Sequence, residues 1–115
     1  MESFGPQRFG RPISAAVAAQ VRQAMEDVVA NGTGGNAAIP GAVVGGKTGT
    51  AQNGVNNSGT PYAWFIAYAR PSENAAAPVA VAVVIEDSNA DRADISGGGL
   101  AAPIARAVMQ AVLNG

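Results

Sequence analysis

The run Lys47-Thr48-Gly49-Thr50 holds the side chains that are best suited to chemistry in this sequence. Lys47 is the only lysine, and two threonine hydroxyls flank a glycine that has no side chain. If this run forms a β-strand, an ammonium group and two hydroxyls would line a slot for an extended substrate that carries a carboxylate. A backbone N–H near Thr50 would then be placed to stabilise an oxyanion during acyl transfer. The alternative is an exposed lysine that protects a sheet edge from pairing.

The same residues complete a formal phosphate-loop pattern. Gly41 to Thr48 reads glycine, four residues, then Gly-Lys-Thr. A phosphate loop needs its Lys-Thr pair to open a helix. Here Val43-Val44 is typical of a strand, and the sequence after Thr48 is TGTAQNGVNNSGTP, which consists of turn residues. Nucleotide binding is therefore the weaker interpretation.

Composition removes several other kinds of chemistry. The chain has 115 residues, a formal net charge of −1, and neither cysteine nor histidine. It therefore offers no thiol nucleophile, no cysteine metal site and no histidine base. Without a basic run, nucleic acid has no electrostatic attraction to it, and the longest apolar run, Val79 to Ile85, is too short to cross a bilayer. Acid–base work must use Lys47 or a carboxylate, and we expect no cofactor and no metal.

The elements that must position this run follow from apolar periodicity and turn residues. We expect an α/β (α+β) chain, in which a three-stranded antiparallel sheet is flanked by an N-terminal and a C-terminal helix. Ser14 is suited to cap the first helix, and Gly32 to end it in the left-handed conformation. The expected order is an extended lead-in over residues 1–12, a helix over about 14–30, strands over about 43–52, 62–69 and 79–87, and a helix over about 100–113.

Some segments carry more specific expectations. The nearly continuous apolar run from Val79 to Asp87 is typical of a central strand that is covered on both faces. The glycines of the first strand indicate either a bulge or bend in the strand, or an open floor for substrate. Trp64 and Phe65 are interpreted as packing residues. The segment SNADRADISGGG, over residues 88–99, is expected to be a flexible loop, and its charges, with Asp87, do not have the ligand spacing of a calcium site.

The order of these runs also resembles a known family. GTGGNAAIPGAVVGGKTGTAQ, then AWFIAYARP, a valine-rich strand and GGGLAAPIARAVMQAVL resemble the C-terminal part of the transpeptidase domain of class B penicillin-binding proteins, of the actinobacterial cell-division type. The resemblance covers about residues 9–113. It implies that residues 1–115 form a single partial domain, a fragment of the fold that penicillin-binding transpeptidases share with serine β-lactamases.

The resemblance implies an enzyme that cross-links peptidoglycan on the extracytoplasmic face of the membrane. In that family a serine attacks a D-Ala-D-Ala stem peptide, and β-lactams acylate the same serine. Lys47 would support proton transfer and electrostatics, and Thr48 and Thr50 would bind the carboxylate of the substrate. Gly49 would keep the strand open, and the Thr50 N–H would be one of the two oxyanion donors.

Two further motifs of the family are missing from this chain. No serine is followed by lysine three residues later, so the nucleophilic Ser-x-x-Lys motif is absent. Ser72-Glu73-Asn74 fits the letters of the Ser-x-Asn motif, but it follows the lysine strand instead of preceding it. We therefore expect a chain that is inactive alone, that takes stem peptides and β-lactams with the missing remainder of its domain, and that self-associates through exposed apolar surface. The alternative is a non-catalytic binding or assembly module on the same scaffold.

Overall fold

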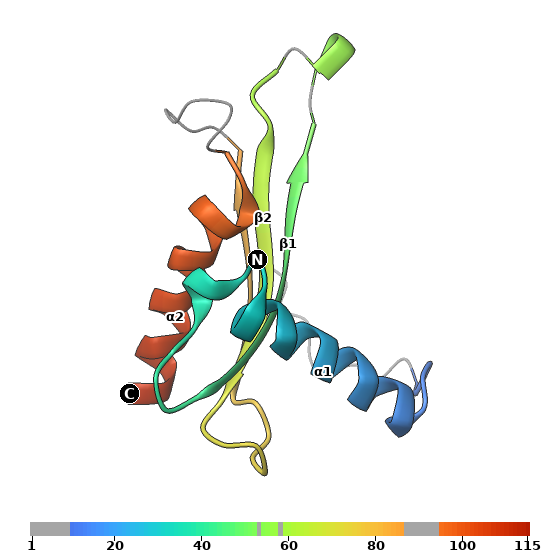
Figure 1. Cartoon of the computed structure of the whole chain (residues 1–115), viewed down its shortest axis with the longest axis vertical. Helices are drawn as coiled ribbons and strands as arrows, with labels where there is room; N and C mark the ends of the chain where they lie inside the picture. The colour runs from blue at the N-terminus through green and yellow to red at the C-terminus, as the bar shows by residue number, and fades with distance from the viewer. Residues whose placement is uncertain (1–9, 53, 58, 87–94) are drawn as a thin grey trace, which may run out of the picture.

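In the computed structural model the chain is described over residues 10–52, 54–57, 59–86 and 95–115. The strands form one antiparallel sheet in the order β1-β2-β3, and α1 and α2 lie on opposite sides of it (Figure 1). This architecture confirms the expected α/β (α+β) fold. The elements are α1 (Ala15–Asn31), η1 (Gly35–Ala37), β1 (Val43–Ala51), η2 (Val55–Asn57), β2 (Tyr62–Arg70), β3 (Val79–Ile85), η4 (Gly97–Ala101) and α2 (Ala102–Asn114).

The core lies between the sheet and α2. Alternate residues of β2 point to this face and are buried: Ala63, Phe65, Ala67 and Ala69. Phe65 and Met109 of α2 are the largest fully buried side chains. Because most other core residues are alanine or valine, the helix lies close to the strands. This small core holds β2, which pairs with β1 in the sheet.

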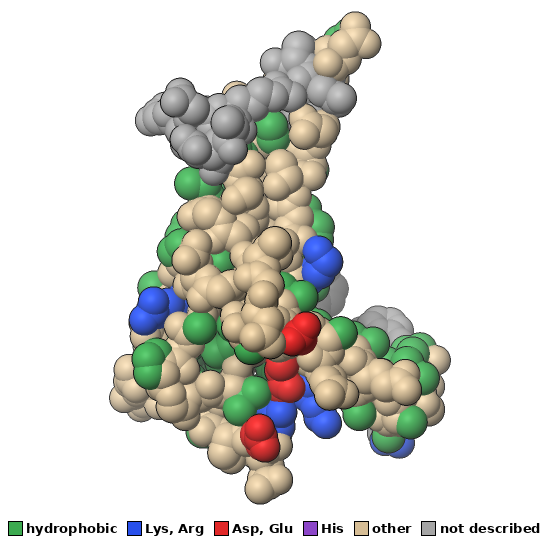
Figure 2. Space-filling model, viewed as in Figure 1, with side chains coloured by type: hydrophobic (Ala, Val, Ile, Leu, Met, Phe, Trp, Pro, Cys, Tyr) green, Lys and Arg blue, Asp and Glu red, His purple; other side chains and the backbone are tan. Residues whose placement is uncertain are grey.

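The first helix begins as expected but packs less than expected. The Ser14 hydroxyl accepts a hydrogen bond from the Val17 N–H at 3.2 Å and so caps the helix. Val17 and Val21 are nevertheless 43% and 49% exposed, because the N-terminal half of α1 projects away from the sheet. Figure 2 shows hydrophobic side chains along this projecting part. The apolar stripe of α1 is therefore only partly covered by the described chain.

The end of α1 differs from the expectation. Gly32 has φ −125°, so it is extended and not left-handed. The helix ends instead with two N–H groups, those of Gly32 and Gly34, donating to the Val28 carbonyl at 3.1 and 3.0 Å. The expected left-handed cap at Gly32 was wrong, because this pair of bonds satisfies the terminal carbonyl without it.

The expectation of a central third strand was also wrong. β3 lies at an edge of the sheet, β2 is the central strand, and the face of β3 away from α2 is exposed at Ala80, Ala82 and Val84. Among the described elements, α2 and the neighbouring η4 pack on one face of β3, so its burial alternates along the strand. The strand ends at Ile85, Glu86 follows it outside the sheet, and Asp87 lies outside the described residues.

The expected loop over residues 88–99 was wrong at its C-terminal end. Residues 88–94, with their aspartates, lie outside the described residues, as do residues 1–9 of the expected lead-in. Gly97 opens a single π-helical turn that leads directly into α2, and both Gly97 and Gly98 are buried. This close packing is possible because glycine has no Cβ: a Cβ on Gly97 would overlap backbone atoms of Trp64 and Gly49. Pro103 follows in the first turn of α2, where it is tolerated.

Candidate functional site

The run Lys47-Thr48-Gly49-Thr50 lies within β1, which is an edge strand. Thr48 pairs with Phe65 and Thr50 with Ala63, so both threonines lie on the face that packs against α2. Lys47 and Gly49 lie on the opposite face. Within the described chain β1 pairs only with β2, which leaves the other edge of β1 open to an extended ligand.

The ammonium group of Lys47 is exposed on this strand. Its Nζ donates to the backbone carbonyl of Thr48 at 2.7 Å. Among the described residues one ion pair forms, between Arg70 and Glu26, and Lys47 takes no part in it. Lys47 therefore presents a positive charge that the described carboxylates do not neutralise.

The glycines of β1 make room for aromatic rings of β2. Pairing continues without interruption from Val43 to Ala51, so the strand contains no bulge. A Cβ at Gly45, Gly46 or Gly49 would overlap the rings of Tyr68, Phe65 or Trp64, respectively. The structure therefore supports neither the expected bulge nor an open floor at these glycines. It confirms that Trp64 and Phe65 are packing residues, with Phe65 fully buried.

Residues from two other segments converge on Thr48, and sequence reasoning missed them. The Thr33 hydroxyl lies 3.0 Å from the Thr48 hydroxyl. Asn36 Nδ2 donates to the Gly98 carbonyl at 2.8 Å, and this joins the connection after α1 to the turn before α2. The sequence marked both segments only as glycine-rich loops. Their glycines signal close backbone approach, but a single sequence does not reveal which backbones approach each other.

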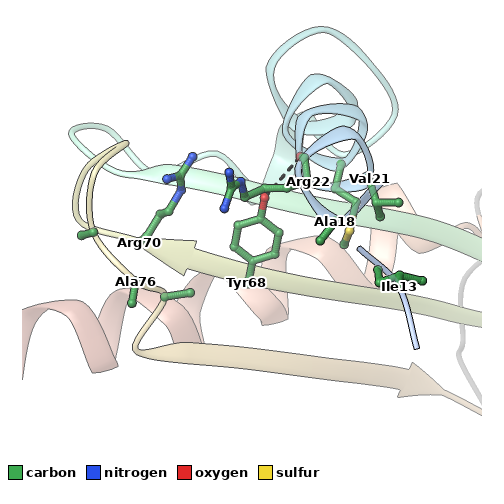
Figure 3. Close-up of a pocket in the computed structure, with 10 residues that line it drawn as sticks. Ile13, Ala18, Val21, Arg22, Tyr68, Arg70 and Ala76 are labelled. Carbon is green, nitrogen blue, oxygen red and sulfur yellow. Dashed lines mark hydrogen bonds between the residues drawn. The ribbon is translucent and has the colours of Figure 1, made fainter. Parts of the chain in front are cut away.

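A second group of polar residues, apart from those around Thr48, lies between α1 and the end of β2 (Figure 3). Arg70 is buried, pairs with Glu26 at 2.5 Å and also donates to the Glu73 carbonyl. The Tyr68 hydroxyl donates to the Arg22 carbonyl at 3.3 Å. Burial, with a smaller contribution from the nearby Glu26 carboxylate, raises the pKa of Tyr68 from 10.0 to about 12. Tyr68 therefore keeps its proton to a higher pH than an ordinary tyrosine does.

This group borders a cavity of about 400 Å³ that is separate from the lysine run. Figure 3 shows the Tyr68 ring pointing from β2 toward α1 beneath this space. Its walls are mostly apolar: Ile13, Ala18, Val21, Met25 and residues 75–77, with Arg22, Tyr68 and Arg70. The cavity exists because α1 diverges from the sheet.

Several other hypotheses can now be judged. The phosphate-loop interpretation was wrong, because Lys47 and Thr48 lie in the middle of a strand and do not open a helix. Ser72-Glu73-Asn74 lies in the exposed connection between β2 and β3, beyond the Val43 end of β1. Within the described ranges, no three acidic residues gather as metal ligands would. None of the helices that the structure describes is both long and apolar enough to span a membrane.

Comparison with known proteins identifies the family. The penicillin binding protein transpeptidase domain model matches residues 6–110. The peptidoglycan D,D-transpeptidase PbpA of Mycobacterium tuberculosis is 46% identical over 108 residues, which are 91% of this chain and 21% of that protein. The stage V sporulation protein D of Bacillus subtilis is 41% identical over 101 residues, or 85% of this chain and 15% of that protein. The chain thus spans only 21% and 15% of the lengths of these two curated relatives.

Solved structures agree with this assignment. The D,D-transpeptidase domain of a peptidoglycan glycosyltransferase from Eggerthella lenta superposes with a TM-score of 0.73 at 36% identity, covering 99% of this chain and 24% of that one. The crystal structure of PBPA from Mycobacterium tuberculosis superposes with a TM-score of 0.70 at 44% identity, covering 88% of this chain and 23% of that one. The chain belongs to the penicillin-binding protein transpeptidase family, as a partial transpeptidase domain of the class B type.

Proposed function

We propose that this chain supplies the carboxylate-binding wall of a peptidoglycan D,D-transpeptidase. One observation carries the proposal: Thr48 and Thr50 lie on one face of an edge strand, and the exposed Lys47 of the opposite face brings its Nζ to 2.7 Å from the Thr48 carbonyl. No described carboxylate neutralises this ammonium group. An extended peptide that lies along the open edge of β1 can reach both hydroxyls and the ammonium group at once. The family, whose relatives include peptidoglycan D,D-transpeptidases, supports this substrate class.

The roles of the residues follow from the chemistry of acyl transfer. The terminal carboxylate of a D-Ala-D-Ala stem peptide accepts hydrogen bonds from the Thr48 and Thr50 hydroxyls, and hydrogen bonds to a charged acceptor are strong. Lys47 adds positive charge near the reacting serine and supports proton transfer. The Thr50 N–H donates to the oxyanion that forms when the serine attacks the carbonyl. A β-lactam, which also carries a carboxylate beside a reactive carbonyl, binds in the same way.

The nucleophile comes from outside this chain. No serine in the sequence stands three residues before a lysine, so the chain alone lacks catalysis. The missing remainder of the domain covers the face of the sheet that α2 leaves open, where Ile66 and Val84 are 44% and 59% exposed. A second cavity of about 440 Å³ lies on this face, where Ile66 of β2, Ala82 of β3 and Met25 of α1 line it. In the absence of the remainder this surface favours self-association. The parent protein acts on the extracytoplasmic side of the membrane, where its substrate lies.

A chimera tests the proposed function. In it, this chain replaces the matched segment of the Mycobacterium tuberculosis relative, and labelling by a fluorescent penicillin is compared between the chimera and the isolated chain. We expect covalent labelling of the chimera and none of the isolated chain. Lys47→Ala should reduce the labelling rate by at least about a hundredfold, because it removes a charge that stabilises the transition state.

The matched control is Arg106→Ala, which removes one exposed positive charge from α2. We expect this variant to label like the unsubstituted chimera. Labelling of the isolated chain would contradict the claim that it lacks a nucleophile. A folded chimera that never labels would favour the second candidate, a non-catalytic assembly module, for which the exposed apolar face is the supporting observation.

A further inference from the structure

The two threonines of the proposed carboxylate site differ in their surroundings. The Thr48 side chain is half-buried, and its hydroxyl oxygen lies 3.0 Å from that of Thr33, a residue 15 positions earlier in the chain. The Thr50 side chain is exposed, and no other described residue forms a hydrogen bond with its hydroxyl. One hydroxyl of the pair therefore has a fixed neighbour, and the other is free to rotate.

The backbone of Thr33 is held in place independently of its own hydroxyl. The Thr33 carbonyl packs against Gly98 so closely that a Cβ on Gly98 would overlap it. Asn36 Nδ2 donates to the Gly98 carbonyl at 2.8 Å, which ties the same two segments together. The Gly34 N–H donates to the Val28 carbonyl at 3.0 Å and fixes the chain on the other side of Thr33. The segment that carries Thr33 is thus clamped between α1 and the turn before α2, and its exposed hydroxyl is not needed for that clamp.

A threonine hydroxyl has one hydrogen to donate and two lone pairs to accept with. When Thr48 donates its hydrogen to a carboxylate, its oxygen remains able to accept from Thr33. A hydrogen bond from Thr33 then holds the Thr48 rotor in the donating orientation and polarises its O–H bond. We propose that Thr33 is a positioning residue that orients the Thr48 hydroxyl toward the carboxylate of the substrate, an inference that rests on the proposed function.

The acylation kinetics of the same chimera test this role. Second-order acylation rate constants are measured with benzylpenicillin and with its methyl ester, which has no free carboxylate. Thr33→Val, which keeps the shape and removes the hydroxyl, should slow acylation by benzylpenicillin about three- to tenfold, the range of one hydrogen bond. Reaction with the ester should be unchanged, so the preference for the free acid falls. Thr33→Ser should restore both the rate and the preference.

A double-mutant cycle separates orientation from folding. If Thr33 acts through Thr48, Thr33→Val should have no further effect in a Thr48→Val background. If Thr33→Val slowed acylation equally with and without Thr48→Val, or equally for benzylpenicillin and its methyl ester, the proposal would be overturned. Such a result would indicate a structural role for Thr33. An unchanged acid preference in Thr33→Val, while the unsubstituted chimera acylates normally, would overturn it and leave the proposed function standing. Failure of the unsubstituted chimera to acylate would overturn both.

Discussion

At the scale of single residues, the glycines of β1 show how closely the site is packed. Gly49 pairs with Trp64 across the sheet, and the indole ring occupies the space where a Gly49 Cβ would lie. The Trp64 ring thereby packs directly on the strand that carries Lys47. Substitutions at the glycines of β1 therefore alter how this strand packs with β2, even when they leave the chemical groups of the site unchanged.

The substitution Gly49→Ala should therefore destabilise the fold. We expect a loss of about 1–3 kcal/mol in the free energy of unfolding, measured by urea denaturation, because the added methyl group must displace the Trp64 ring. Gly35→Ala is the matched control, since the nearest atom to its Cβ would be 3.8 Å away. Equal stability of the two variants would show that Trp64 moves aside without cost.

Tyr68 gives a prediction for alkaline pH. Its pKa is about 12 in the folded chain against 10.0 for an ordinary tyrosine, so the unfolded chain loses this proton first. The stabilising contribution is complete below about pH 10 and is lost as the pH rises toward about 12. Tyr68→Phe should make the fall in unfolding free energy between about pH 9 and about pH 11.5 less steep. Parallel curves for both proteins would contradict the burial of this hydroxyl.

At the scale of elements, one ion pair links α1 to the sheet. Arg70 at the end of β2 is buried and contacts Glu26, which lies in the half of α1 that packs against the sheet. Figure 2 shows charged side chains gathered where α1 meets the lower part of the sheet. The pair thus joins α1 to the end of β2 at the border of the cavity.

Replacing Glu26 with glutamine should loosen this junction. The substitution removes a charge-assisted hydrogen bond from a buried guanidinium, so we expect a loss of about 1.5–3 kcal/mol in urea denaturation. Hydrogen exchange in α1 should become faster than in α2. Glu86→Gln, which changes an exposed carboxylate just after β3, serves as the control and should leave both measurements unchanged.

At the scale of the whole molecule, this chain has a closed face and an open face. α2 packs on one side of the sheet, and α1 covers only one end of the other side. The open face carries exposed large hydrophobic residues, and β3 adds an unpaired strand edge within the described sheet. Surfaces of this kind bind a partner or associate with themselves.

A charge on the open face should therefore weaken self-association of the isolated chain. We expect Ile66→Glu to raise the dissociation constant by about tenfold or more, since it removes one large apolar side chain from the contact. Sedimentation velocity over a range of concentrations measures this. Val55→Glu is the control, because Val55 is 81% exposed in the turn beyond β1. A monomeric unsubstituted chain at high concentration would contradict self-association through this face.

The sequence by itself determined the order and type of the elements. The apolar period of 3.6 in the helices, the β-branched residues of the strands and the Ser14 cap are local signals, and the structure confirms them. It also predicted which residues carry the proposed chemistry, since only one lysine is present and its threonine neighbours are adjacent in the chain. Local signals suffice for such features because neighbouring residues in sequence are neighbours in a strand.

Only the tertiary structure decided the surroundings of that run. The contact of Thr33 with Thr48, the burial of Gly97 and Gly98, and the edge position of β3 each depend on segments that are distant in the chain. A glycine in a sequence is equally consistent with a turn, a bulge or close packing, and the choice depends on which backbone or ring approaches it. Likewise, an apolar strand does not reveal whether its second face is covered, because that depends on what else packs there.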